Sequence, residues 1–369
     1  MAPRTSALTY AAAQTARVAF YGAHYLVARV LARDAFTSMK KPDHPVPSLS
    51  AMLKAMRKLF AKDWANVREG LYPAPVDGMA EVRRATKSLK FLADIPRVAK
   101  RQKRGGHSDV KADENLPRYF RQNFHFQTDG YLSKDSAKLY DFQVEALFAG
   151  TADAMRRQAF VPIARALKNR QAGRLTLLDV GCGTGTFLQF AKDAKPKLNA
   201  IALDLSEPYL EEARRALRGY SGVKFVQAPA EDMPLPDASV DFAVSIYLFH
   251  ELPPKVRAAV AQEIARVLKP GGIFVLADSI QYGDADGFDG LLDAFPHLLH
   301  EPYFSTYAKA DFDTLFAAAN LERIESSNAY LTKVSVFQKV AEKKRAVKPK
   351  TPSKAKQRLR FRKARPASD

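Results

Sequence analysis

The chain has 369 residues, of which 47% are hydrophobic and 26% are charged, so it is neither fibrous nor predominantly disordered. At roughly 100 to 200 residues per domain, this length allows two or three domains. The formal net charge of +19 lies in the flanks: residues 1–130 hold 23 basic and 11 acidic residues, residues 131–341 hold 23 and 26, and residues 342–369 hold 12 and 2. The single cysteine, Cys182, excludes an internal disulfide and a cysteine-rich metal site and fits a reducing, cytoplasmic location.

Residues 1–117 are predicted to form a basic helical region. Helical runs at 7–35, 48–70 and 79–104 are separated by KKPDHPVP and LYPAPVDG, whose prolines stop helices. In the first run Phe20, Val27 and Leu31 lie beside a polar and aromatic group that includes Arg17 and Tyr21. We expect the apolar group to pack against the protein itself; the alternative is a membrane interface, with peripheral membrane association.

Residues 1–33 also contain four arginines and no acidic residue, which leaves an organelle transit peptide open. Polar residues interrupt the most apolar stretch, 10–32, before it reaches the ~18 apolar residues of a spanning helix, so no transmembrane segment is predicted.

From residue 118 to 341 the pattern changes to short apolar strands that alternate with amphipathic helices, which is typical of an α/β fold with a parallel sheet. Strands are predicted at 175–180, 200–204, 223–227, 240–246 and 273–278, and helices at 186–194, 209–217 and 255–268. A further helix at 311–320 precedes two strands within 321–340, whose tight connection requires them to be antiparallel.

The sequence LLDVGCGTGTF at 177–187 places three glycines on alternate positions directly after a strand. Such a loop lets the backbone approach a ligand closely, and the following helix supplies free N–H donors. A P-loop is excluded because Gly185 is followed by Thr186 and not by lysine. The G-x-G-x-G spacing also differs from the G-x-G-x-x-G of dinucleotide sites.

This loop, with the later stretches IALDLS, APAEDMPLPDASVDFAVS and RVLKPGGIFVLADS, resembles the class I S-adenosylmethionine-dependent methyltransferases. The overall style is similar to the ubiquinone and menaquinone biosynthesis C-methyltransferases. The resemblance implies a Rossmann-like fold with a mostly parallel seven-stranded sheet and an antiparallel last strand, S-adenosyl-L-methionine as the cofactor, and a hydrophobic or lipid-like acceptor.

Carried onto this sequence, the resemblance implies a set of cofactor-binding residues at the ends of successive strands. Asp204 is expected to accept hydrogen bonds from both ribose hydroxyls, Asp232 from the adenine amino group, and Asp179 from the ligand's amino group. The full set is Asp179, Gly181, Cys182, Gly183, Gly185, Asp204, Leu205, Asp232, Met233 and Tyr247.

The fourth strand of such a fold ends near the transferring methyl group, and here it is followed by SIYLFHELPP. His250 is therefore a candidate general base or substrate-holding residue and Glu251 its neighbouring carboxylate; the alternative is that both only begin the next helix. Tyr131 and Tyr303 are chosen as pocket residues from two aromatic-rich segments, 118–143 and 295–312, which are expected to cover the acceptor together. No metal is expected, because the seven histidines show no ligand spacing.

The primary interpretation is a methyltransferase that acts on a small-molecule substrate. An RNA methyltransferase that uses the basic flanks, and a catalytically silent scaffold that binds the cofactor, remain as alternatives. Residues 342–369 are expected to be a disordered basic tail that attracts an anionic membrane surface or nucleic acid. The sequence does not indicate an oligomeric state.

Overall fold

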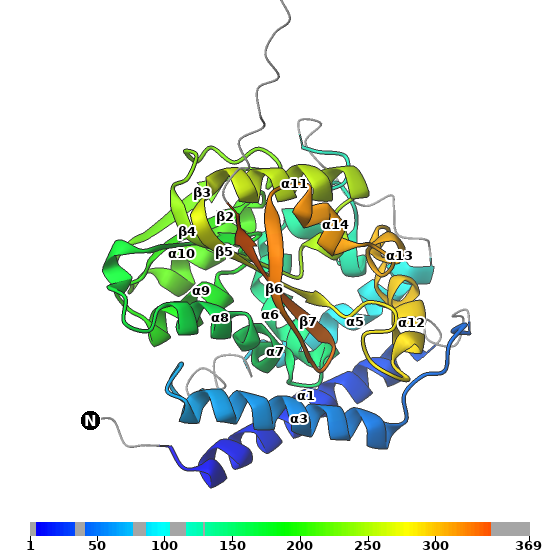
Figure 1. Ribbon diagram of the computed structural model, residues 1–369. Coiled ribbons are helices and arrows are strands. Elements are labelled where there is room, and N and C mark those ends of the chain that lie inside the picture. Colours follow the sequence, from blue (N-terminus) through cyan, green and yellow to red (C-terminus); the bar gives the residue numbers. More distant parts are fainter. Residues whose placement is uncertain (1–4, 34–40, 77–85, 104–115, 128–129, 341–369) are drawn as a thin grey trace, which may run out of the picture.

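The computed structural model describes residues 5–33, 41–76, 86–103, 116–127 and 130–340 (Figure 1). The predicted basic tail at 342–369 lies outside the described residues. Before the sheet the chain forms a succession of helices, which are α1 (Ala7–Leu31), α3 (Leu49–Arg68), α5 (Ser88–Lys103), η1 (Phe124–Phe126), η2 (Gly130–Leu132), α6 (Lys134–Leu147), α7 (Ala152–Gln158), α8 (Phe160–Ala166) and η3 (Ala172–Arg174). Within the described ranges, no helix is both long enough and apolar enough to cross a bilayer.

A seven-stranded sheet with the order β3-β2-β1-β4-β5-β7-β6 forms the centre of the molecule. Its strands are β1 (Thr176–Val180), β2 (Asn199–Asp204), β3 (Val223–Gln227), β4 (Val240–Ile246), β5 (Leu268–Ser279), β6 (Leu321–Ala329) and β7 (Thr332–Lys339). The first five pair in parallel, and β7 is antiparallel to both β5 and β6. This confirms the predicted α/β, Rossmann-like sheet with an antiparallel last strand.

Helices cover both faces of the sheet because alternate strand residues point to opposite sides and nearly all are apolar (Figure 1). One face packs on α8, α9 (Thr186–Ala194) and α10 (Glu207–Leu217), and the other on α11 (Pro254–Val267), α13 (Phe304–Tyr307) and α14 (Phe312–Ala317). The remaining elements are η4 (Phe249–Glu251) and α12 (Asp289–Leu299).

The strand order reverses between β1 and β4, so the loops after these two strands diverge. A crevice at such a switch point, beyond the carboxyl ends of the strands, is the usual ligand site of an open α/β sheet. The glycine loop follows β1, and η4 follows β4, so both border this crevice.

The helix α1 partly buries only one member of the apolar group that the sequence favours: Phe20 is half-buried and packs against Tyr21 and Phe142. The buried residues of α1 are Tyr10, Gln14 and Tyr21, whereas Val27 and Leu31 are 42% and 50% exposed. Polar partners decide this orientation: Arg17 lies 2.7 Å from the Glu145 carboxylate and 2.9 Å from Asp153. The expectation that Val27 and Leu31 face the protein is therefore wrong.

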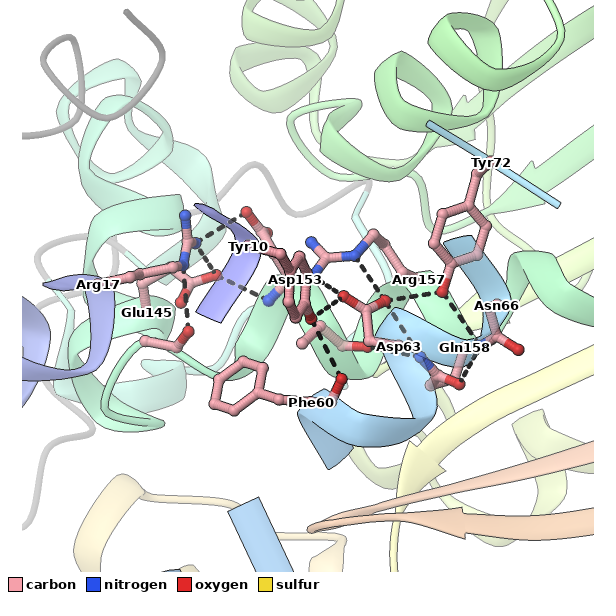
Figure 2. A network of polar contacts seen from close by, with 12 residues as sticks. Tyr10, Arg17, Phe60, Asp63, Asn66, Tyr72, Glu145, Asp153, Arg157 and Gln158 are labelled. Atoms are coloured by element: carbon pink, nitrogen blue, oxygen red, sulfur yellow. Dashed lines mark hydrogen bonds and ion pairs between the residues drawn. The ribbon is translucent and has the colours of Figure 1, made fainter. Parts of the chain in front are cut away.

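A buried polar network joins α1 and α3 to α7 (Figure 2). Asp63 is fully buried, and its two oxygens accept hydrogen bonds from Arg157 Nε at 3.0 Å and Nη2 at 2.6 Å. The hydroxyls of Tyr10 and Tyr72 donate to the same carboxylate at 2.6 and 2.7 Å. Gln158 Nε2 also donates to it, at 3.4 Å, so α1 and α3 are joined to α7 by a carboxylate that accepts five hydrogen bonds.

Candidate active site

The glycine loop turns tightly between β1 and α9 because all three glycines have positive φ angles, 75° at Gly181, 54° at Gly183 and 78° at Gly185. The N–H groups of Gly181 and Cys182 donate to the carbonyl of Leu203 at 2.9 Å, which ties the loop to the end of β2. Gly181 and Gly183 line the crevice. Gly185 does not; an added Cβ there would lie 3.1 Å from the Ala213 Cβ, so this glycine serves the close packing of α9 on α10.

Asp204 ends β2 opposite the loop, and its side chain is directed into the crevice. One carboxylate oxygen accepts the Gly183 N–H and the other the Ser206 N–H, each at 2.8 Å. Each oxygen keeps a second lone pair for a ligand hydroxyl. Ser206, and not Asp204, caps α10 by accepting the Tyr209 N–H, so the carboxylate is not used up as a helix cap.

Asp179 is 2% exposed and lines a neighbouring recess together with Cys182 and Tyr247. Burial, and then the nearby Asp204 carboxylate, raises the pKa of Asp179 to about 8. Among the described residues its carboxylate makes no hydrogen bond with the glycine loop. Asp141 of α6 holds the loop instead, accepting from the hydroxyls of Thr184 and Thr186 at 2.9 and 3.0 Å.

The two residues predicted to contact adenine lie outside the crevice. Asp232 is exposed, and Met233 is 3% exposed within the hydrophobic core, where its N–H donates to Glu263. Ala228 and Ala230 line the crevice in their place, together with Leu205 as expected. The turn after β3 explains why Asp232 and Met233 do not line the crevice as expected. This turn presents small residues to the crevice and directs Asp232 to solvent.

The crevice has about 740 Å³ of empty space, including its open mouth. Aromatic side chains form much of its wall: Tyr119, Phe120, Phe124, Tyr131, Tyr140, Tyr209 and Tyr247. Five of these come from the first aromatic segment identified in the sequence. The second segment contributes none, because Phe304 and Tyr307 are buried in the core and Tyr303 packs against the outside of the aromatic wall. Tyr303 is therefore not a pocket residue.

Glu251 lines the crevice at the end of β4, and the hydroxyl of Tyr131 donates to its carboxylate. His250 lies behind Glu251, 6% exposed, with its Nδ1 2.6 Å from Asp278 Oδ1. Burial by itself lowers the pKa of His250, but Asp278, Glu301 and Glu251 together raise it to about 9. His250 is not among the residues that line the crevice, and its role as a general base or substrate-holding residue stays a prediction.

Sequence reasoning missed two residues near the crevice. Arg156 of α7 lines the recess beside Asp179, and Asp141 fixes the loop. His125 and Glu301 belong to the two aromatic segments that the sequence predicts to cover the acceptor together, but the sequence assigns no role to either. His125 Nε2 lies 2.6 Å from Glu301 Oε1 and 3.9 Å from Glu251 Oε1.

Comparison with known proteins agrees with this geometry. Residues 177–272 match the family model described as a methyltransferase domain. A demethylmenaquinone methyltransferase of Clavibacter sepedonicus is 39% identical over 103 residues, which are 28% of this chain and 40% of that protein. A sterol 4-C-methyltransferase of Caenorhabditis elegans is 36% identical over 110 residues, 30% of this chain and 32% of that protein. A carboxy-S-adenosyl-L-methionine synthase of Aeromonas hydrophila is 34% identical over 122 residues, 32% of this chain and 48% of that protein.

The chain therefore spans about half or less of the length of these curated relatives. Among solved structures, a 1,6-didemethyltoxoflavin-N1-methyltransferase from Burkholderia thailandensis is 21% identical, with a TM-score of 0.40 over 56% of this chain and 88% of that chain. The matched segment begins in β1 and includes the glycine loop and Asp204. Residues 177–272 thus belong to a class I S-adenosylmethionine-dependent methyltransferase domain.

Proposed function

We propose that this protein is an enzyme that transfers a methyl group from S-adenosylmethionine to a small hydrophobic or lipid-like acceptor. The observation that carries the proposal is one crevice that combines the glycine loop and Asp204 with an aromatic wall. Ligand sites of this kind are mostly apolar with a few placed polar groups. The quinone and sterol names of the matched relatives support the same class of acceptor.

The residues present fit the cofactor. A Cβ added to Gly183 would have only the Tyr209 ring within 4 Å, so open space lies over the loop where a ligand has to approach the backbone. Asp204 would accept from the two ribose hydroxyls. In the adjoining recess Asp179 and Arg156 offer opposite charges to the ammonium and carboxylate of an amino acid. When bound, the cofactor supplies an activated sulfonium methyl group.

The protein's own contribution is then to align the acceptor and to exclude water. The rings of Phe120 and Phe124 each stack on the ring of Tyr131, with the ring centroids of Phe124 and Tyr131 5.4 Å apart. These rings make this part of the wall apolar, which suits a ring or chain of carbon atoms. Glu251, held by Tyr131, places a carboxylate at the inner end, where it can orient or accept the proton of an acceptor hydroxyl.

The exposed side of the N-terminal helices suits an anionic membrane surface. Leu26, Val30 and Leu49 are 63%, 74% and 72% exposed, and the surrounding residues 1–130 hold more than twice as many basic as acidic residues. Apolar side chains flanked by basic ones favour an anionic bilayer interface. We propose that this surface brings the crevice to an acceptor that resides in a membrane.

The test is to incubate the full-length protein with methyl-labelled S-adenosylmethionine and, separately, with a lipid extract in anionic vesicles and with total RNA. We expect the label in the organic phase, with turnover that falls as salt rises because vesicle binding is electrostatic. The variant Asp204→Ala should lose the label, whereas Asp135→Asn, at a side chain that is 94% exposed, should retain it. Label in RNA alone would favour the RNA methyltransferase, and no label with intact cofactor binding would favour the silent scaffold.

Asp179 predicts a pH dependence of cofactor binding. With a pKa of about 8 its carboxyl is mainly protonated at pH 6.5 in the free protein. An ammonium group beside it favours the ionised form, so binding should release close to one proton, and affinity should rise by up to about tenfold per pH unit between pH 6 and 7.5. Calorimetry with S-adenosylhomocysteine in buffers of different ionisation enthalpy measures this release. Asp179→Asn should abolish it; an unchanged release in that variant would contradict the assignment.

A further inference from the structure

Three side chains from distant parts of the sequence converge at the inner end of the crevice. They are His125 of η1, Glu251 of η4 and Glu301, which lies between α12 and α13. One potential ligand atom from each lies within 4.8 Å of the other two. Imidazole nitrogen and carboxylate oxygens in this number and proximity form a typical donor set for a divalent metal ion.

Glu301 is the second, independent observation. It is 2% exposed, its Oε1 forms an ion pair with His125 Nε2 at 2.6 Å, and within the described part of the chain its Oε2 has no hydrogen-bond partner. Buried carboxylates are ordinarily satisfied by hydrogen bonds or bind a cation, because desolvation of the charge is costly. Among the described residues, Glu301 forms an ionic contact with His125, and its carboxylate is directed into the cluster.

His250 adjoins the cluster without belonging to it. Its Nδ1 is bonded to Asp278, and its Nε2 lies 3.9 Å from Glu251 Oε1. The three residues whose ligand atoms lie within 4.8 Å of one another are His125, Glu251 and Glu301. His250 is therefore a neighbour of Glu251 and is not counted among the ligands.

We propose that His125, Glu251 and Glu301 bind one divalent transition-metal ion. Two atoms bound to one ion at about 2.1 Å lie about 3.0 to 3.4 Å apart, so His125 and Glu301 need to separate by less than about 1 Å. Nitrogen and carboxylate ligands suit Mn²⁺, Fe²⁺, Co²⁺ or Zn²⁺.

The position of the ion gives it a role that rests on the proposed function. Glu251 lines the crevice beside the aromatic wall, so an open coordination position would face the acceptor. An acceptor oxygen bound there would be oriented, and the pKa of its hydroxyl would fall because a cation stabilises the deprotonated form. The acceptor class is thereby narrowed to hydrophobic molecules that carry a hydroxyl or carbonyl oxygen.

The experiment titrates the full-length, chelator-treated protein with two metal ions in separate samples. Binding of Mn²⁺ is monitored by electron paramagnetic resonance, and binding of Co²⁺ is monitored by its visible absorption. We expect one ion per chain, and about 100-fold or more weaker binding in Glu301→Gln. The matched control Glu322→Gln, at an exposed position of β6, should bind the ion as the wild type does. Should Glu301→Gln fail to fold, the wild-type stoichiometry and the variant His125→Gln carry the test.

Binding of S-adenosylhomocysteine is measured on the same samples, because Glu301 is not among the residues that line the cofactor end. Cofactor binding without any metal binding, or metal binding that is unaffected by both variants, would overturn the metal site and leave the proposed function standing. Metal binding without cofactor binding would overturn the proposed function and leave the metal site.

Discussion

Replacing Asp204 by alanine is expected to weaken the binding of S-adenosylhomocysteine by about 100-fold or more. Two charge-assisted hydrogen bonds to the ribose at about 1.5 kcal/mol each sum to about 3 kcal/mol, which corresponds to roughly 100-fold in affinity. The substitution also removes the acceptor of the Gly183 N–H, so the glycine loop loses one of the contacts that hold it against the end of β2. Isothermal titration calorimetry measures the change directly.

The variant Asp204→Asn separates these two effects. An asparagine keeps the size of the side chain and one acceptor oxygen, so it should preserve most of the loop and still lose the charge that strengthens both ribose bonds. We expect Asp204→Asn to bind S-adenosylhomocysteine with an affinity between that of the wild type and that of Asp204→Ala. If Asp204→Ala binds S-adenosylhomocysteine with wild-type affinity while its melting temperature is unchanged, the cofactor is not held at this carboxylate.

Replacing Asp63 by alanine is expected to lower the free energy of unfolding by about 3 to 5 kcal/mol, the usual cost of removing one partner of a buried ion pair. Figure 2 shows Arg157 bonded to the Asp63 carboxylate. Arg157 is 6% exposed, so the substitution would leave a buried cation without its bidentate acceptor. The hydroxyls of Tyr10 and Tyr72 would lose their acceptor as well. Urea-induced unfolding, monitored by circular dichroism, measures the change in the free energy of unfolding.

Glu69 lies at the end of α3, the helix that carries Asp63, and provides the control. It forms ion pairs with Arg165 and Lys168, but its side chain is 38% exposed, and exposed pairs contribute little. Glu69→Ala should therefore change stability far less than Asp63→Ala. Because the uncompensated cation causes most of the loss, the double variant Asp63→Leu with Arg157→Met should recover part of it. Equal effects at Asp63 and Glu69 would show that the buried network does not stabilise the fold.

The same network bears on the organisation of the chain. We propose that residues 1–117 form a helical cap that unfolds together with the domain at 118–341, since Asp63 of α3 is bonded to Arg157 of α7. A cap of this kind would keep the α1 surface in a fixed position relative to the crevice. In Figure 1, α1 and α3 lie side by side on the flank of the sheet domain, which agrees with this arrangement.

Local patterns in the sequence were sufficient for the sheet and the glycine loop. The predicted strand at 240–246 coincides with β4 because seven consecutive residues favour a strand that is buried on both faces. The G-x-G-x-G loop was readable because the turn itself requires residues that adopt positive φ angles. The position of Asp204 followed from the loop, since the carboxyl ends of neighbouring parallel strands lie at the same edge.

Predictions of which side chains face the protein interior were less successful where contacts with a distant segment decide the orientation. Helical spacing favoured burial of Val27 and Leu31, but the carboxylates Glu145 and Asp153 paired with Arg17 and turned the other side of α1 inward. Tyr303 was selected for its position in an aromatic segment, yet that segment packs on the core.

The sequence by itself determined the order and type of the elements and the tight turn of the glycine loop, because these depend on short-range periodicity and backbone conformation. The cofactor and the role of the carboxylate that ends β2 came from the family resemblance of the loop and the later motifs. Only the tertiary structure decided that Asp63 meets Arg157 and that His125, Glu251 and Glu301 meet at one point. Such contacts join residues from about 50 to more than 170 positions apart, and no local rule of spacing connects them. They form because packing brings distant loops together, and there the electrostatic cost of burying a charge selects its partner.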